Sequence, residues 1–352
     1  MMTFDINYYK GMTAKLNEVL HLDIQLRPAT AFVVLPEAEL SGQVIRFNPK
    51  LETMMLLFDL SLQSKTLSSR AVNRFLLYHL HLGKGHYSDA GKMLQLLSQD
   101  VSALKQPVGK ASSGTTIDTL LLQTSFALCH EVSHIYFRCN PAKRTEEVEG
   151  VRGIIDDITR HFGQGLNMLP RWMRAIWPKS TLLYIDDAFD YSSDKINDNL
   201  CEEIACDILA YNLVMNVMLA SGFSREEMTI EGANISMVID FLETYKQLED
   251  AYLNSKKDIQ HHNVRINTLR HTCLFYVVWE WIEQQMDRAT KYVKHLNAYG
   301  CDSRYGIFAG FFHHLSLVDS LRMDKQPPDA KAVQQLEREY KAIDDVIRST
   351  IV

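Results

Sequence analysis

Two histidines four positions apart, with a glutamate next to the first, form the motif in this sequence that is best suited to chemistry. Residues 130–134 read His-Glu-Val-Ser-His. On a helix, positions i and i+4 lie on one face a turn apart, so the imidazoles of His130 and His134 can reach one metal ion. Glu131 projects beside them, where it can bind the water of the metal without being a ligand. The order therefore predicts a Zn²⁺ site with an adjacent general base.

The residues around this motif favour a buried, rigid helix. Glu131 is the only Asp, Glu, Lys or Arg within residues 126–136. Thr115 followed by Asp118 has the spacing of a capping box, which predicts a helix start there, and Pro141 is expected to stop the helix. A buried helix of this kind would hold the ligands of a metal ion in fixed positions.

A third ligand is expected much further along the chain, because catalytic zinc takes three protein ligands and keeps a fourth position for water. Glu203 and Asp207 share a helix face, so Glu203 can ligate while Asp207 accepts the spare N–H of a ligand histidine. Glu202 also fits by charge, but its i+4 residue is Cys206, a poor orienting partner, and it points about 100° away from Glu203. The predicted ligand set is two imidazoles and one carboxylate: His130, His134 and Glu203.

The two motifs together resemble those of the gluzincin metallopeptidases. The long gap and the Glu-Ile-Ala-Cys-Asp form of the second motif are similar to the group that contains the prenyl-protein (CAAX-type) proteases, related quality-control peptidases and bacterial phage-exclusion peptidases. A soluble member of the phage-exclusion type is the closer match, since no spanning helix is expected here. The resemblance covers residues 130–207. It implies a zincin-like core, a zinc-dependent endopeptidase with a specific protein substrate, and a role in a bacterial stress or phage-defence response.

The same resemblance suggests residues that could stabilise the oxyanion formed when water attacks a carbonyl. Members of the group often carry a His-Pro segment followed by Arg-Ile, and His262 and Arg265 stand in a comparable place without the proline. A solvated helix start is an equal alternative for them. Tyr211 lies one turn past Asp207 and could face the site, although a core tyrosine is the more common role. The three candidates for this role are His262, Arg265 and Tyr211.

Composition and charge narrow the class of protein. The 352 residues carry a formal net charge of -6, which argues against a nucleic-acid partner. We expect no signal peptide, since residues 1–12 lack a charged start and an apolar stretch, and no membrane span, since no run of 18 apolar residues occurs. With no secretory signal expected, the six cysteines are interpreted as reduced thiols, so a cytoplasmic location is expected. None sits in a CxxC pair, which argues against a zinc site built from cysteines. The expected partners are a protein or peptide substrate and a regulatory protein.

The hydrophobic pattern predicts an α+β fold that is predominantly helical. Short strands are expected at 31–35 and 43–47, with a weaker one at 182–185. Residues 1–222 would form the zincin-like core with a small N-terminal sheet, and residues 223–352 an extended helical C-terminal lobe, unless the two make one compact unit. The predicted helices after the first strands span 50–62, 68–82, 88–105, 115–137, 145–161, 195–220, 231–254, 260–297 and 330–350.

A binding or regulatory protein is the alternative to an enzyme, and a second group of histidines has a structural interpretation. A zincin-fold protein with little catalytic power could instead bind or regulate a partner through its helical half, although the intact Glu131 favours an enzyme. The histidines at 79, 81 and 86 lie near two glycines and have no obvious acidic partner, so they are interpreted as a helix end and loop.

Overall fold

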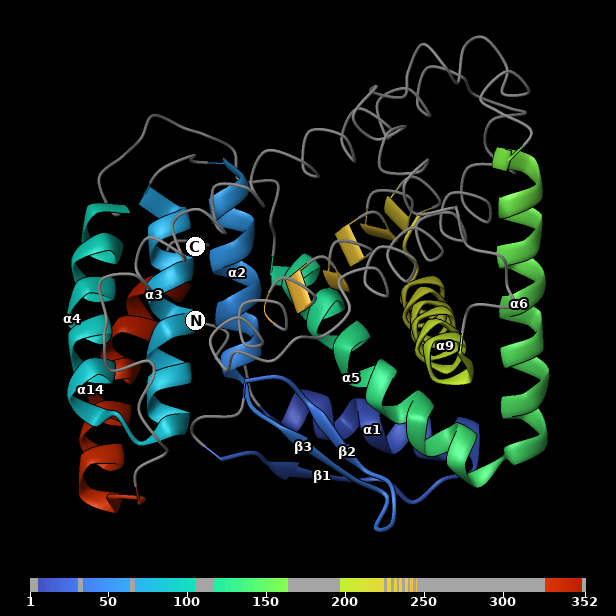
Figure 1. Ribbon diagram of the computed structural model, residues 1–352, viewed down its shortest axis with the longest axis horizontal. Coiled ribbons are helices and arrows are strands. Elements are labelled where there is room, and N and C mark those ends of the chain that lie inside the picture. Colours follow the sequence, from blue (N-terminus) through green and yellow to red (C-terminus); the bar gives the residue numbers. More distant parts are fainter. Residues whose placement is uncertain are drawn as a thin grey trace, which may run out of the picture.

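Helices make up most of the described chain, and one small sheet lies beside them (Figure 1). The structure is a computed structural model, and it describes residues 6–30, 34–63, 67–104, 117–163, 197–224 and 327–349, together with isolated positions between 227 and 245. The predicted class, α+β with helix dominant, is confirmed for this part of the chain.

The elements, labelled as in Figure 1, begin with a helix and three short strands: α1 Ile6–Leu20, β1 Gln25–Pro28, β2 Glu37–Glu39 and β3 Val44–Phe47. The helices that follow are α2 Lys50–Gln63, α3 Leu67–Lys84, α4 Tyr87–Leu104, α5 Ile117–Cys139, α6 Pro141–Gly163, α9 Asp198–Ala220 and α14 Ala330–Arg348.

The sheet has the strand order β1-β3-β2, with β1 parallel and β2 antiparallel to β3. The strand predicted at 43–47 is confirmed as β3. The strand predicted at 31–35 is wrong over its described end, because Val34 and Leu35 are not in a strand and pairing begins only at Glu37. Pro36 has no N–H to donate to a ladder, which explains why β2 starts after it. Val34 is nevertheless buried, so the apolar run reflects packing rather than pairing.

Helix ends follow from local signals in the sequence. Asn197 caps the start of α9, where its side chain accepts a hydrogen bond from the Leu200 N–H at 2.8 Å. The helix ends in a Schellman motif: Gly222 has a φ of +83°, and the Phe223 N–H bonds the Met218 carbonyl at 3.2 Å. The end of the helix predicted at 195–220 is therefore confirmed.

Two other helix boundaries, at Ser224 and at Pro141, also follow from local sequence signals. Ser224 and Glu227 form a capping box, since the Ser224 N–H donates to the Glu227 carboxylate at 2.7 Å and the Glu227 N–H donates to the Ser224 hydroxyl at 3.3 Å. Pro141 ends α5 as expected, but it also opens α6 at once, because proline suits the first helical position. The helix predicted at 145–161 thus begins four residues earlier. The capping box at Thr115 and the strand predicted at 182–185 lie outside the described residues.

Helix α5 is the central helix of the described fold. It packs against α2, α6, α9 and two strands of the sheet, and runs between them in Figure 1. The side chains around the histidine motif are almost fully buried: Phe126, Ala127, Leu128, Cys129, Val132, Ser133, Ile135 and Phe137. Close packing on all sides fixes the helix and its side-chain directions, as the uncharged segment at 126–136 predicts.

The last helix, α14, packs against α2 and α4 near the start of the chain. One face of this helix is apolar and turned inward: Val333 is partly buried, and the fully buried residues are Leu336, Tyr340, Ile343 and Ile347. Tyr340 stacks on Tyr78 of α3, with ring centroids 5.6 Å apart. The division at residue 222 stays a prediction, but this helix of the C-terminal part shares a core with the N-terminal helices.

A buried ion pair joins the end of α14 to α2. The Arg348 guanidinium donates to Glu52 at 2.6 Å and to Asp344 at 2.7 Å, and Glu52 is 1% exposed. Tyr9 of α1 also donates to Glu52. Burial raises the pKa of Glu52, and the Arg348 charge opposes that rise. The guanidinium therefore lowers the free-energy cost of burying the Glu52 carboxylate.

Arg348→Ala is therefore expected to destabilise the fold by about 3–5 kcal/mol, because it leaves the Glu52 carboxylate buried without its cation. Urea unfolding would measure the loss. Arg338→Ala is the matched control on the exposed face of the same helix, and it should change the unfolding free energy by less than about 0.5 kcal/mol. Adding Glu52→Gln to Arg348→Ala should restore part of the loss. Equal effects of the two arginine variants would contradict this account.

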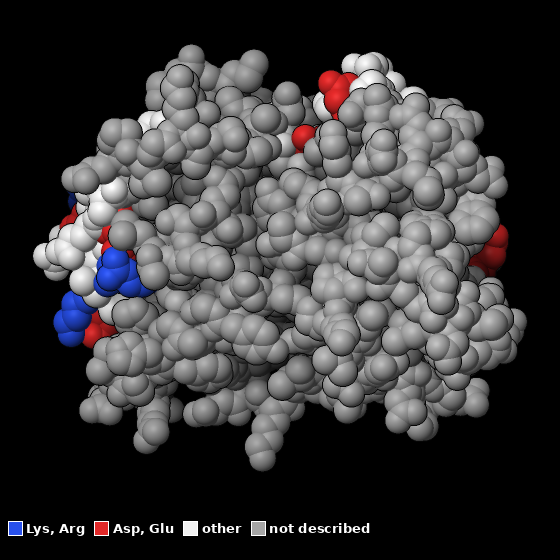
Figure 2. All heavy atoms as spheres, turned by 90° about the horizontal axis from the view of Figure 1, so that it is seen from above, with Lys and Arg blue, Asp and Glu red and all other residues white. Residues whose placement is uncertain are grey.

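Among the described helices, α9 alone is long and apolar enough to cross a membrane by length and composition. A core helix of a soluble protein meets the same test, and half of the apolar stretch of α9 is buried in the protein. Figure 2 shows the molecule from above, where the described charged side chains lie towards the rim, with basic and acidic groups together at the left and acidic groups at the top and right. The cytoplasmic location stays a prediction.

Candidate metal centre

The two histidines of the motif lie on successive turns of α5, and their Nε2 atoms face each other at 3.1 Å. Their rings are close to perpendicular, with centroids 4.8 Å apart. His130 is 6% exposed, and His134 is partly buried. The helix spacing thus brings both lone-pair-bearing nitrogens to one point, as predicted.

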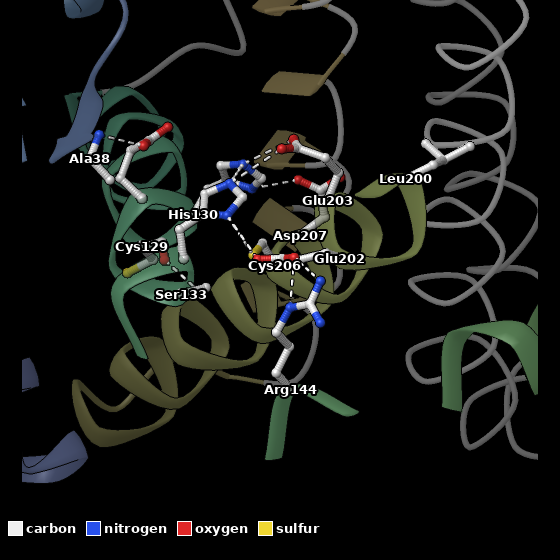
Figure 3. A network of polar contacts seen from close by, with 12 residues as sticks. Ala38, Cys129, His130, Ser133, Arg144, Leu200, Glu202, Glu203, Cys206 and Asp207 are labelled. Atoms are coloured by element: carbon white, nitrogen blue, oxygen red, sulfur yellow. Dashed lines mark hydrogen bonds and ion pairs between the residues drawn. The ribbon is translucent and has the colours of Figure 1, made fainter. Parts of the chain in front are cut away.

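Glu203 of α9 completes the donor set. One carboxylate oxygen lies 3.5 Å from the Nε2 of His130, and the other lies 3.4 Å from the Nε2 of His134 (Figure 3). Ligands on a tetrahedral zinc with bonds of 2.0–2.1 Å would be about 3.3–3.4 Å apart. The three residues therefore fit a single metal ion of that size, and the donor set could hold one.

Asp207 fixes the orientation of the first ligand. Its Oδ1 lies 2.9 Å from the Nδ1 of His130, and the side chain is fully buried. A carboxylate at Nδ1 favours the tautomer with the proton on that nitrogen, which leaves the lone pair of Nε2 for a metal. Asp207 thus lies where the i, i+4 spacing with Glu203 predicts.

The second ligand has partners that the sequence analysis did not identify. The Nδ1 of His134 lies 3.4 Å from the Cys206 sulfur and 3.8 Å from Glu202. Arg144 of α6 bonds Glu202, with its Nε at 2.8 Å, and this contact raises the pKa of the guanidinium. The rotation of about 100° between Glu202 and Glu203 predicted that Glu202 would point away from the site. Its carboxylate instead lies near His134. It faces the outer nitrogen of His134 because His134 lies one turn from His130.

Glu131 follows His130 in the sequence, and its carboxylate contacts the sheet. Its Oε2 accepts a hydrogen bond at 2.8 Å from the backbone N–H of Ala38 in β2. An N–H donor interacts best with an ionised carboxylate, which is the form that can accept a proton. No signal local to residues 130–134 points to Ala38, because the contact joins positions 93 apart in the chain.

The role of Tyr211 as an oxyanion stabiliser stays a prediction, and its ring packs in the core. The Tyr211 ring belongs to the main apolar core, and a side chain at Gly232 would meet its hydroxyl at 2.5 Å, so this hydroxyl lies against the Gly232 backbone. Burial raises the pKa of Cys129 to about 12, which keeps that thiol protonated next to the motif. His262 and Arg265 lie outside the described residues.

Comparison of the chain with protein-family models, with curated proteins and with solved structures finds no match. The donor geometry is therefore the basis for assigning a metal to this centre.

Proposed function

We propose that this chain is a zinc-dependent endopeptidase in which His130, His134 and Glu203 hold Zn²⁺ and Glu131 is the general base. The observation that carries the proposal is the arrangement of three donor groups at 3.1–3.5 Å, with a carboxylate next in sequence that turns to one side. Two imidazoles and one carboxylate are a recurrent catalytic zinc set.

Bound zinc would supply a coordinated water of lowered pKa and would polarise a substrate carbonyl. Glu131 would take the proton of the attacking water and pass it to the leaving amine. Asp207, Glu202 and Cys206 would hold the two imidazoles in the orientation that the ligands need. The apolar contacts between α5, α6 and α9 would keep these partners in place.

The neighbouring strand favours an extended peptide as the substrate. In the described part of the sheet, β2 pairs with β3 on one side only, and Ala38 of β2 holds the Glu131 carboxylate. A strand at a sheet edge can align an extended peptide by main-chain contacts. A protein substrate in a stress or phage-defence response, a regulatory partner and a cytoplasmic location are further parts of the proposal, and they depend on the motif resemblance alone.

Cleavage is tested with zinc-loaded protein and a protein extract of the cells that express this chain. New N-termini identified by mass spectrometry should appear with the wild type and be absent with His130→Ala or after chelation. The matched control is His21→Asn, at an exposed histidine with a φ of 53°, which asparagine tolerates. It should cleave as the wild type does. Protein that binds zinc and cleaves nothing would overturn the proposal in favour of a binding or regulatory protein.

A further inference from the structure

A second group of metal-ligand residues lies at the corner between α3 and α4. His81 is in the last turn of α3, His86 directly precedes α4, and Asp89 is in its first turn. One potential ligand atom from each lies within 4.8 Å of the others. The sequence predicts only a helix end and loop for these histidines, whereas the structure places the carboxylate of Asp89 near them.

The backbone of the corner brings the two histidines together. Gly85 adopts a φ of +79°, which glycine reaches at low cost, and its N–H bonds the Leu82 carbonyl at 3.1 Å. The His86 N–H bonds the His81 carbonyl at 2.9 Å. These two bonds are those of a Schellman motif, so His86 is folded back over the last turn of α3.

The start of α4 then returns the carboxylate to the same place. The carbonyl of His86 accepts the N–H of Asp89 at 3.1 Å and that of Ala90 at 2.9 Å, so His86 occupies the cap position and Asp89 lies one turn on. The positions of all three ligand groups are thus set by main-chain hydrogen bonds. Residues separated by five and three positions therefore come together through a turn and a helix start, and not by sharing one helix face.

The two histidines of this group are buried. His81 is fully buried and His86 is 5% exposed. A neutral imidazole offers a lone pair to a metal ion, and burial keeps the His81 ring away from bulk water. Asp89 pairs with the exposed Lys92 at 3.0 Å, and its carboxylate offers one ligand atom to the group.

We propose that His81, His86 and Asp89 form a second metal site, which takes a first-row divalent cation such as Zn²⁺ and fixes the corner between α3 and α4. Nitrogen donors select such ions over Ca²⁺ or Mg²⁺, which prefer oxygen alone. The three ligand atoms lie within 4.8 Å of one another, and a bound zinc ion would bring any wider pair to the ligand spacing of about 3.3–3.4 Å. The site is separate from the first one, since α4 and α9 lie on opposite sides of the molecule in Figure 1.

The corner also touches the last helix, which gives the site a structural role. The Tyr87 hydroxyl, next to His86, accepts the N–H of Asp329 at 2.8 Å, and Asp329 caps α14. A metal ion at His86 would therefore hold the ends of three helices: α3, α4 and α14. No residue of the proposed catalytic centre takes part.

Metal content per chain after dialysis against zinc tests the site, with His130→Ala as the background that removes the first centre. This variant should retain about one equivalent of zinc. Adding Asp89→Asn, which keeps the shape of the side chain, should weaken the remaining zinc by at least about 10-fold in a chelator competition. Adding His86→Asn as well should remove it.

Lys92→Gln is the matched control, because it removes the ion pair of Asp89 without removing a ligand. In the His130→Ala background it should retain the zinc. Zinc should also raise the unfolding temperature of His130→Ala but not that of the triple variant. His130→Ala without zinc, or an Asp89→Asn variant that holds zinc as tightly as its parent, would overturn the second site and leave the first one untouched.

Discussion

Glu131→Gln is expected to keep the metal and to lower the rate of peptide cleavage by about 10²–10⁴-fold or more. The side chain lies beside the ligand pair and bonds Ala38 of β2, so its carboxylate is not needed to hold the ion. Glutamine retains a carbonyl oxygen that can accept the same Ala38 N–H, which should preserve the local structure. What the variant loses is the group that accepts a proton.

Metal analysis and the cleavage rate of one identified substrate would be measured on the same preparation. Glu37→Gln is the matched control, because it makes the same chemical change on an exposed residue of β2 next to Ala38. It should leave both quantities unchanged. If Glu131→Gln lost zinc, Glu131 would be a ligand, and if it cleaved at the wild-type rate, the general base would be another group.

The parts of the centre that local spacing determines could be predicted from the sequence. His130 and His134 share a helix face because four residues make about one turn, and the same rule places Glu203 and Asp207 together. The ligand count of catalytic zinc predicted that the two pairs would meet, and the packing of α5 against α9 is what the structure adds. The zincin-like core itself stays a proposal, since the described fold is only a helical α+β arrangement with a small sheet.

The missed contacts join elements that are distant in the chain. Arg144 reaches Glu202 across 58 positions, and Ala38 reaches Glu131 across 93. Strand β1, a short polar segment at Gln25–Pro28, has no alternating pattern and exists because it pairs with β3. Such pairings depend on how helices and strands pack, and the periodicity of one segment carries no information about its partner.

The cluster at His81 was missed for a different reason. Its residues are close in sequence, but spacings of five and then three residues do not place all three side chains on one face of a single helix. Only the left-handed conformation of Gly85, followed at once by a new helix, brings them together. Glycine between two histidines near a helix end, with an acid three residues on, is a signal that could have been used.

Replacing the residues of α9 one at a time is expected to weaken zinc binding in the order Glu203, Asp207, Glu202. Glu203→Gln removes the only anionic ligand and should lose the metal of this centre. Asp207→Asn keeps the ligands but weakens the bond at 2.9 Å that orients His130, an effect typically worth about 10–100-fold. Glu202→Gln should cost less than Asp207→Asn, because Glu202 lies 3.8 Å from the Nδ1 of His134 and shares that nitrogen with Cys206.

A graded series of zinc chelators would rank the three variants in a background where the second site has been removed by Asp89→Asn and His86→Asn. Asp198→Asn is the control, since it removes an exposed charge from the same helix away from the ligands, and it should bind zinc as its parent does. Glu202 held by Arg144 predicts a small but measurable loss in Glu202→Gln, whereas a residue that points away predicts none. Release of zinc first from Glu202→Gln would identify Glu202 as the ligand, and the fit of Glu203 between the two imidazoles would then be a coincidence of helix packing.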